Sequence, residues 1–349
     1  MAARVTVKIL LGSYHFSPSI GGIETVSELL AREFVTLGHE VHVLTQTPGG
    51  NAFPFVVVRR PGAAELVRQV RWCDVFLQNN ISLRTLWPLL FIRRPLFVVH
   101  QTWIRNASGE IGWQQRLKCF VLRFAKSIAI SQAIAAELPT PAVVIGNPFD
   151  DDLFADHGHD HTRDLIYVGR LVSDKGVDLL IEALSILRES GKRTQLTIVG
   201  DGPDRAGLEK QVADLGLHSS VQFIGSRRGS QLAEILNQHR ILIVPSRWRE
   251  PFGIVALEGI ACGCVVVASD QGGLPEAIGP CGVTFPNNDA RALANALAQL
   301  MNDPTRRDEL RQNAGSHLAR FTKRHVAEAY LNLMEKNLAL RPLEAGTAH

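Results

Sequence analysis

The sequence predicts an α/β protein with two parallel sheets. Short runs rich in Val, Ile and Leu alternate with helical patterns along nearly all of its 349 residues, which is typical of repeated strand–helix–strand units. The alternation stops once, over residues 147–163, and then resumes with the same rhythm. At about 150 residues per domain, the length also fits two domains. We therefore expect two domains of the same class, at residues 1–148 and 149–322.

Seven strands are expected in the first half, and helical stretches lie between most of them. The strands are 5–11, 41–45, 55–59, 74–78, 96–100, 127–130 and 142–145. After the first strand, apolar residues from Ile23 to Leu37 recur at helical spacing. Gly38 is suited to end that helix, because glycine readily adopts the left-handed conformation found at helix C-termini.

Six strands and five helices are expected after the interruption. The strands are 164–168, 194–199, 221–224, 241–244, 265–268 and 283–285, and the helices are about 176–190, 204–215, 229–238, 253–262 and 289–301. Two further amphipathic helices close the sequence, at about 304–318 and 323–338.

The interruption itself has no hydrophobic period, so we interpret residues 147–163 as a flexible polar linker. Its Asp and His residues at 156–161 suggest a metal-binding tract as an alternative, but no second cluster completes a site. The five cysteines form no CxxC pair, which argues against a zinc site and a disulfide framework. We expect no bound metal.

Composition indicates a soluble globular protein, with 46% hydrophobic and 20% charged residues. No apolar run approaches the roughly 18 residues needed to span a bilayer, and the N-terminus does not read as a signal peptide. We expect a cytoplasmic protein that is at most peripheral on the inner face of the membrane. A nucleic-acid-binding role has little support, because the pI of about 8.7 is only moderately basic and no recognised motif occurs.

Positive charge is concentrated in the first half. Residues 1–150 contain 15 Lys and Arg against 9 Asp and Glu, and residues 80–126 contain eight basic residues and one acidic residue, Glu110. Such a surface favours an anionic partner. With Trp87, Trp103 and Trp113 interspersed, residues 80–126 suit an anionic membrane surface; a solvated basic face is the alternative.

Ligands of open parallel sheets bind beyond the carboxyl ends of the strands, so the residues after each strand are the candidates for a site. Gly21 and Gly22 follow the first strand and open a helix, where backbone can approach a negatively charged ligand closely. Arg170 and Lys175 follow the first strand of the second half. Two fixed cations suit a diphosphate, although each loop is also compatible with an ordinary surface turn.

The most informative segment contains two glutamates separated by seven residues, Glu250 and Glu258. Glu250 lies in a loop before a helix, and Glu258 lies on that helix among apolar neighbours. A carboxylate in such surroundings is costly unless it is bonded, and the hydroxyl groups of a ligand would satisfy it. N–H groups around Gly253 and Ile254 are free to meet a phosphate. A helix-start acid is the alternative for Glu250, but it explains Glu258 less easily.

Several segments together resemble the retaining glycosyltransferases of family 4, which have the GT-B fold. The Glu250-x7-Glu258 pattern before "GIACG" resembles the family signature, and "GRLVSDKG" at 169–176, "GDGP" at 200–203 and "GGLPE" at 272–276 match in order. Gly21-Gly22 and Asn147-Pro148 also fit. The resemblance implies two Rossmann-like, doubly wound domains facing a central cleft, with residues 323–349 returning to the first domain.

The resemblance also implies roles for individual residues. Arg170 and Lys175 would neutralise the diphosphate of a UDP- or GDP-sugar in place of a divalent metal. Glu258 would hold the ribose, Glu250 would contact the donor sugar, and His100 would lie near the anomeric centre. A strand-end histidine with a purely structural role is the alternative for His100. The other implied donor-binding positions are Gly21, Gly22, Gly225, Phe252, Gly253 and Ile254.

The implied activity is transfer of a sugar to a glycan or lipid-linked acceptor, in cell-envelope or exopolysaccharide synthesis, with retention of configuration. The first domain would bind the acceptor and the second the nucleotide sugar. An NAD-dependent oxidoreductase is excluded, because Gly200-Asp201-Gly202 is followed by Arg205 where GxGxxG needs glycine. A nucleotide-sugar epimerase, a phosphorylase and a non-catalytic interaction protein remain as alternatives on the same fold.

Overall fold

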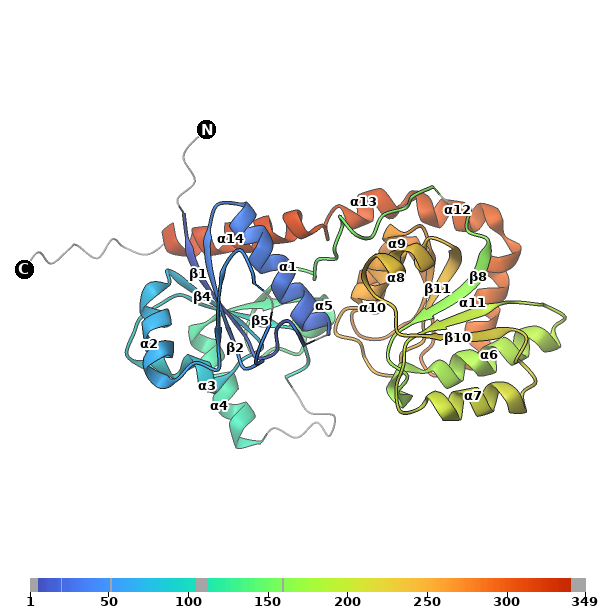
Figure 1. The fold of residues 1–349 in the computed structure, drawn as a ribbon, viewed down its shortest axis with the longest axis horizontal. Coiled ribbons are helices and arrows are strands. Elements are labelled where there is room, and N and C mark those ends of the chain that lie inside the picture. The colour runs from blue at the N-terminus through green and yellow to red at the C-terminus, as the bar shows by residue number, and fades with distance from the viewer. Residues whose placement is uncertain (1–5, 20, 51, 105–111, 159, 340–349) are drawn as a thin grey trace, which may run out of the picture. The chain divides into compact units, whose positions relative to one another are not determined.

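A computed structural model describes residues 6–19, 21–50, 52–104, 112–158 and 160–339. The chain divides into two compact units, Met1–Pro148 with Lys323–His349, and Phe149–Thr322. Each unit is built on one parallel sheet with helices against it (Figure 1). The prediction of an α/β fold with two sheets of the same class is therefore confirmed.

The first unit has a seven-stranded sheet of order β3-β2-β1-β4-β5-β6-β7, and every pairing is parallel. The strand order reverses between β1 and β4, which makes that boundary the switch point of the sheet. The strands are β1 (Lys8–Ser13), β2 (Glu40–Thr45), β3 (Val56–Arg59), β4 (Val75–Asn79), β5 (Leu96–His100), β6 (Lys126–Ala129) and β7 (Ala142–Val144).

The helices of the first unit are divided between the two faces of its sheet. They are α1 (Gly22–Thr36), α2 (Ala63–Trp72), α3 (Leu83–Leu86), η1 (Trp87–Leu90), α4 (Trp113–Val121), η2 (Leu122–Phe124) and α5 (Gln132–Ala135). Because β4, β5 and β6 are successive neighbours, the right-handed rule places α3 and α4 on the same face. A shared apolar cluster that includes Leu66 of α2, Leu86 of α3 and Leu122 of η2 agrees with this placement.

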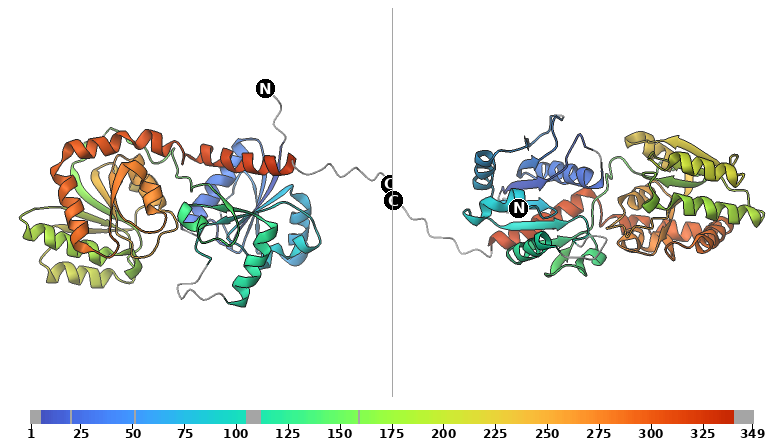
Figure 2. Two further views of the ribbon diagram at one scale, coloured as in Figure 1. Left: turned by 180° about the vertical axis from the view of Figure 1, so that it is seen from behind. Right: turned by 90° about the horizontal axis from the view of Figure 1, so that it is seen from below.

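Helix α14 (Lys323–Ala339) belongs to the first unit and packs against α1 (Figure 2). The rings of Phe34 and Tyr330 lie 6.5 Å apart, and Arg324 pairs with Glu33 at 3.8 Å. Tyr330 is buried, so the contact is apolar with an ionic edge. Residues 340–349, which were expected to continue this return, lie outside the described residues.

The second unit has a six-stranded sheet of order β10-β9-β8-β11-β12-β13, again parallel throughout. Its switch point lies between β8 and β11. The strands are β8 (Arg163–Val168), β9 (Leu196–Val199), β10 (Val221–Gly225), β11 (His239–Val244), β12 (Val265–Ser269) and β13 (Gly282–Phe285). Each strand lies within three residues of the position that its Val, Ile and Leu content predicts.

Ten helical segments of the second unit connect and cover these strands within the described residues. They are η3 (Ser173–Lys175), α6 (Val177–Glu189), α7 (Arg205–Asp214), α8 (Gly229–Leu236), α9 (Ile254–Ala261), α10 (Leu274–Ile278), η4 (Gly279–Cys281), α11 (Ala290–Asn302), α12 (Pro304–Gln312) and α13 (Ala314–Leu318). Buried residues of α6 and α11, such as Leu180 and Leu297, pack with strand residues in the main core of the unit.

Two local predictions were wrong. The single helix expected at 304–318 is broken at Asn313, whose side-chain amide donates to the carbonyl oxygens of Glu309 and Pro280. The segment 147–163 is not a free polar linker along its length. Phe149 and Phe154 are buried, and the Phe149 amide donates to the carbonyl of Phe321 at 3.1 Å. Apolar anchors within a polar sequence hold this segment on the second unit.

Candidate functional site

The carboxyl ends of β8 and β11 meet at the switch point of the second sheet, and their loops are fastened to one another. The amides of Arg247 and Trp248, after β11, donate to the carbonyl of Asp174, after β8, at 2.9 and 3.0 Å. The guanidinium of Arg247 also binds both carboxylate oxygens of Asp178 at the start of α6, at 2.5 and 2.8 Å. This bidentate pair fixes the register of the two loops.

Lys175 and Glu250 meet across this switch point. The Lys175 Nζ lies 2.5 Å from Glu250 Oε1, and the hydroxyl of Ser246 donates to the same oxygen at 2.7 Å. The side chains are partly covered, with 22% and 16% exposed, so solvent screens their charges less than on an open surface. The structure thus brings two predicted site residues from different loops into direct contact.

Glycines allow the neighbouring loops to approach this closely. Gly176 has φ +68°, and a β-carbon there would collide with the carbonyl oxygen of Pro245. Gly200, after β9, has φ +148°, and a β-carbon there would collide with the carbonyl oxygen of Gly169. Only glycine combines this backbone conformation with such contact, so the loops after β8, β9 and β11 form one packed surface.

Arg170 belongs to the same cluster. It is exposed, and its guanidinium makes no ion pair with another described residue. Burial raises the pKa of Tyr167; the charge of Glu250 raises it further, and the charge of Arg170 opposes the rise. The Tyr167 hydroxyl donates to the Arg170 carbonyl at 2.9 Å. Of the two predicted cations, Lys175 is paired with Glu250, whereas Arg170 is available to an anion from outside the protein.

Glu258 lies on α9 and is partly buried. Burial raises the pKa of its carboxyl from 4.5 to about 7, and the nearby charge of Asp150 adds to the increase. The carboxyl makes no hydrogen bond to another described side chain or backbone group. A costly carboxyl without a partner is a strong sign of a ligand-binding role, because an incoming hydroxyl would supply the missing bond.

The other predicted donor-binding positions lie at the same edge of the second sheet, with one qualification. Gly253 (φ +120°) precedes α9, which begins at Ile254 and has no side-chain cap, so its first N–H groups are open to an acceptor. Gly225 ends β10 and accepts from the Gly200 amide at 3.0 Å. The ring of Phe252, however, is buried against Phe321, so Phe252 offers a ligand its backbone and not its side chain.

Three predicted residues lie on the first unit. Gly21 precedes α1 and Gly22 begins it, directly after the loop that follows β1. His100 ends β5 and is 1% exposed, with Nε2 3.3 Å from the Ser127 hydroxyl. Burial lowers the pKa of His100 to about 4, so its imidazole is neutral near pH 7.

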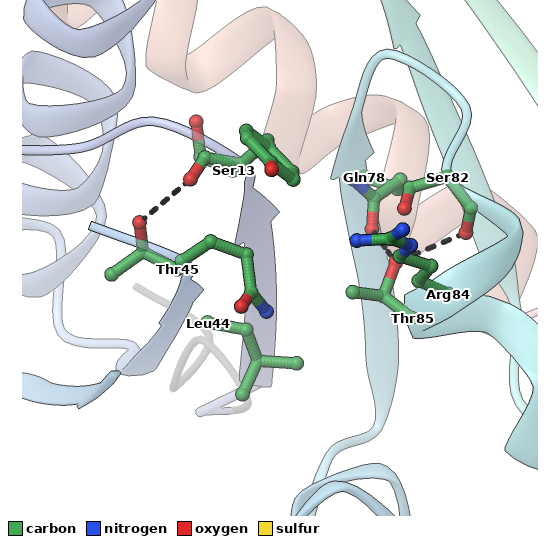
Figure 3. A pocket seen from close by; sticks show the side chains of 9 residues that line it. Ser13, Leu44, Thr45, Gln78, Ser82, Arg84 and Thr85 are labelled. Atoms are coloured by element: carbon green, nitrogen blue, oxygen red, sulfur yellow. Dashed lines mark hydrogen bonds between the residues drawn. The ribbon is translucent and has the colours of Figure 1, made fainter. Parts of the chain in front are cut away.

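The first unit also carries a cavity of about 450 Å³ at its own switch point, which the sequence did not single out. It is lined by the loops after β1 and β4 and by α3 and α4, through Tyr14, His15, Ile23, Asn79, Asn80, Ile81, Ser82, Leu83, Arg84, Trp113, Gln114 and Lys118. A smaller pocket adjoins it and shares Tyr14, Ser82 and Arg84. Figure 3 shows Arg84 near Ser82 and Gln78 in this second pocket.

The described residues offer neither a membrane-spanning helix nor a metal-binding cluster. None of their helices is long and apolar enough to cross a bilayer. They also contain no group of three or more His, Cys, Asp or Glu side chains arranged to hold a metal ion.

Residues 149–317 match the family described as glycosyl transferases, group 1. The second unit therefore belongs to this family, and the resemblance seen in the sequence is confirmed. The matched region carries Arg170, Lys175, Glu250 and Glu258, the residues whose geometry is described above.

Curated relatives match the same half of the chain. A D-inositol 3-phosphate glycosyltransferase of Stackebrandtia nassauensis is 38% identical over 177 residues, which cover 47% of this chain and 40% of that protein. An alpha-D-kanosaminyltransferase of Streptomyces kanamyceticus is 33% identical over 160 residues, 45% of this chain and 41% of that protein. These matches span about two fifths of the relatives' own length.

Solved structures match over nearly the whole chain. A sucrose-phosphate synthase from Thermosynechococcus elongatus has a TM-score of 0.79 at 22% identity, covering 96% of this chain and all of that one. HepE of Anabaena, in complex with UDP and glucose, has a TM-score of 0.78 at 21% identity, covering 95% of this chain and all of that one. At this identity the likeness shows the fold, which is GT-B.

Proposed function

We propose that the chain is a retaining, metal-independent glycosyltransferase that moves a sugar from a UDP- or GDP-sugar to a glycan or lipid-linked acceptor. The observation that carries the proposal is the contact of Lys175 with Glu250 across the switch point of the second sheet, next to loops that present Arg170 and an uncapped α9. A diphosphate needs cations and N–H donors at one place, and this edge supplies them.

Each residue then has a chemical task. Arg170, Lys175 and the α9 N-terminus stabilise the negative charge that builds on the departing diphosphate. Glu250 already holds Lys175, so it orients this cation and meets the donor sugar beside it. Glu258 gains from the ribose hydroxyls the hydrogen bonds that it lacks. His100, neutral near pH 7, positions the transferred sugar through a hydrogen bond and not through charge.

Transfer with retention needs no covalent intermediate in this scheme. The acceptor oxygen attacks the anomeric carbon on the side that the diphosphate leaves, and a phosphate oxygen takes the acceptor proton. The glycosidic bond forms as the carbon–phosphate oxygen bond breaks. HepE, similar in fold, is solved with UDP and glucose and with UDP-glucose, and this supports a nucleotide sugar as donor. We place the reaction in cell-envelope or exopolysaccharide synthesis, at the inner face of the membrane.

A ligand panel tests the donor class. UDP, GDP and their sugars are added to the purified chain, and thermal unfolding is followed. A nucleotide at one hundred times its Kd stabilises by about 2.7 kcal/mol. We expect one nucleotide to shift the transition and the other to do so weakly; absence of a shift with every nucleotide and nucleotide sugar would contradict the proposal.

Measurements of sugar transfer by substituted chains test the roles assigned to these residues. Lys175→Ala should lower transfer more than tenfold, because the loss of one such electrostatic contact costs about 2–4 kcal/mol. Lys210→Ala is the matched control, since Lys210 pairs with Asp214 on the exposed side of α7 and such pairs contribute little. Full activity in excess chelator is expected as well. Strict dependence on added magnesium would refute the metal-free scheme.

A further inference from the structure

The outer face of α4 and η2 is apolar, and its side chains are exposed instead of packing into the core of the first unit. Trp113, Leu117, Phe120 and Phe124 are 73%, 42%, 53% and 74% exposed. Their spacing of four, three and four residues places them on one helical face. Helix α4 contributes no buried residue to the core, and the buried residue of η2, Leu122, lies on the opposite side of the turn. We call these four residues the α4 stripe.

Positive charge flanks the α4 stripe. Arg116 and Arg123 are exposed, and their separation by two helical turns places them along one edge of the stripe. Residues 80–104 and 112–126 together contain seven Lys and Arg and no Asp or Glu. This combination of a Trp- and Phe-rich face with a basic border is typical of a helix that lies in the interface of an anionic bilayer.

A second exposed apolar element lies on the same face of the sheet. Leu90 and Phe91, at the end of η1, are 79% and 81% exposed, and Arg93 follows them. The neighbouring residues Leu89 and Val121 pack against one common core cluster, which ties η1 to α4. Figure 1 shows α3 beside α4 at this side of the first unit.

The 450 Å³ cavity adjoins the α4 stripe, because Trp113 belongs to both. Among the described residues that line it, Arg84 and Lys118 are cationic, none is acidic, and neither cation has an ion-pair partner in the described chain. Asn79 also lines the cavity; it is 3% exposed, and its Oδ1 has no hydrogen-bond partner. Its volume lies in the range of small-molecule sites.

We propose that the α4 stripe inserts into the surface of an anionic bilayer and that the cavity binds the phosphate-bearing, hydroxylated head group of a membrane lipid as the acceptor. Arg84 and Lys118 meet the phosphate, Asn79 accepts from a hydroxyl group, and the rings of Tyr14 and Trp113 pack on the head group. The acceptor role rests on the proposed function. We favour a bilayer over a protein partner because residues 80–104 and 112–126 carry seven Lys and Arg and no Asp or Glu, and charge of one sign beside an apolar face is attracted to anionic lipids.

Cosedimentation with vesicles tests the docking. Vesicles of phosphatidylcholine alone and with phosphatidylserine are compared at low and high salt. We expect binding only to the anionic vesicles, weakened by salt. Phe120→Ser and Phe124→Ser should each weaken it about tenfold or more, because each removes a ring from the bilayer. Val56→Ser, at an exposed apolar residue of β3, should leave binding unchanged. Equal binding by all variants would overturn the docking surface.

Fluorescence gives a direct reading of insertion from Trp113, a residue of the α4 stripe itself. Lipids brominated in the acyl chains quench a tryptophan that enters the bilayer. We expect quenching in the wild-type chain and clearly weaker quenching in Trp113→Phe, in which exposed Trp87 of η1 remains. Quenching of equal extent in the wild type and Trp113→Phe, or none in the wild type, would overturn the assignment.

Head-group recognition is tested at equal membrane charge. Phosphatidylinositol carries a phosphate and a ring of hydroxyl groups, whereas phosphatidylserine carries no ring. We expect several-fold tighter binding to vesicles with phosphatidylinositol, and Arg84→Ala with Lys118→Ala should remove this preference. Equal binding of the wild type to both lipids would overturn the head-group site. Vesicle binding by a chain that transfers no sugar would instead refute the proposed function, and transfer to soluble acceptors without vesicle binding would refute the present inference.

Discussion

The carboxyl of Glu258 makes the strongest quantitative prediction, because its folded environment works against its charge. Its pKa rises from 4.5 to about 7 in the folded chain. A folded pKa above the unfolded value means that, between these two values, the native state holds a proton that the unfolded state has lost. Stability therefore falls as pH rises from about 4.5 to about 7 and stays reduced above it.

The substitution Glu258→Gln removes this titration and keeps the shape of the side chain. A shift from 4.5 to about 7 at 1.36 kcal/mol per pKa unit gives an upper bound of about 3 kcal/mol. Partial exposure of the side chain lowers the bound, so we expect a gain of about 1–3 kcal/mol at pH 8. Most of the gain should vanish at pH 5, where the native carboxyl is already protonated.

Two measurements check the prediction together. Chemical unfolding of wild type and Glu258→Gln at pH 5 and pH 8 gives the stability difference, and titration with the nucleotide that binds gives the affinity. We expect the variant to be more stable at pH 8 and to bind its nucleotide more weakly, because residues that lower stability in a binding site commonly contribute to binding. A variant that is less stable than wild type at pH 8 would refute the reasoning.

Three further predictions concern the loops and the first unit. Gly200→Ala should destabilise by more than about 1 kcal/mol, because the left-handed backbone and the Gly169 carbonyl leave no room; Gly207→Ala, in open space on α7, should be neutral or stabilising in the same denaturant titration. Burial opposes the ionisation of Asp178, but the hydrogen bond and charge of Arg247 outweigh this effect and lower the pKa of Asp178. The wild-type chain therefore loses stability as pH falls below about 4, and Asp178→Asn should lose less over the same range. His100→Asn should lower kcat without changing the pH profile between 6 and 8 if His100 acts while neutral; an unchanged kcat in the folded variant would leave it a structural residue.

The strands could be predicted from sequence because both faces of a parallel sheet are buried. Runs such as Leu96–His100 and Val265–Ser269 consist of buried residues at every position, so they appear as short continuous apolar stretches. Gly38, with φ +91°, ends α1 where its identity predicts. The break at Asn313 could not be predicted, because it depends on a hydrogen bond to Pro280, more than 30 residues away.

The candidate site of the second unit was predictable in its residue types but not in its contacts. Lys175 and Glu250 lie 75 residues apart, and only the strand order places their loops together. Ser246, which shares the Glu250 oxygen, and Asp178, which holds Arg247, were not singled out, because neither residue type is unusual at the end of a strand or the start of a helix.

The α4 stripe shows what a periodic pattern leaves undecided. Trp113, Leu117, Phe120 and Phe124 repeat at helical spacing, and the usual interpretation of such a stripe is a face turned toward the core. In this unit, Leu66, Leu86 and Leu122 already cover that face of the sheet, so α4 lies with its apolar residues outward. The periodicity of apolar residues predicts a helix with one apolar and one polar face. Which face is buried depends on whether neighbouring elements already cover the sheet with their own apolar side chains. Exposure of such an apolar stripe to water is unfavourable, and a partner that covers the stripe removes this unfavourable contact. The charges beside it then select an anionic surface.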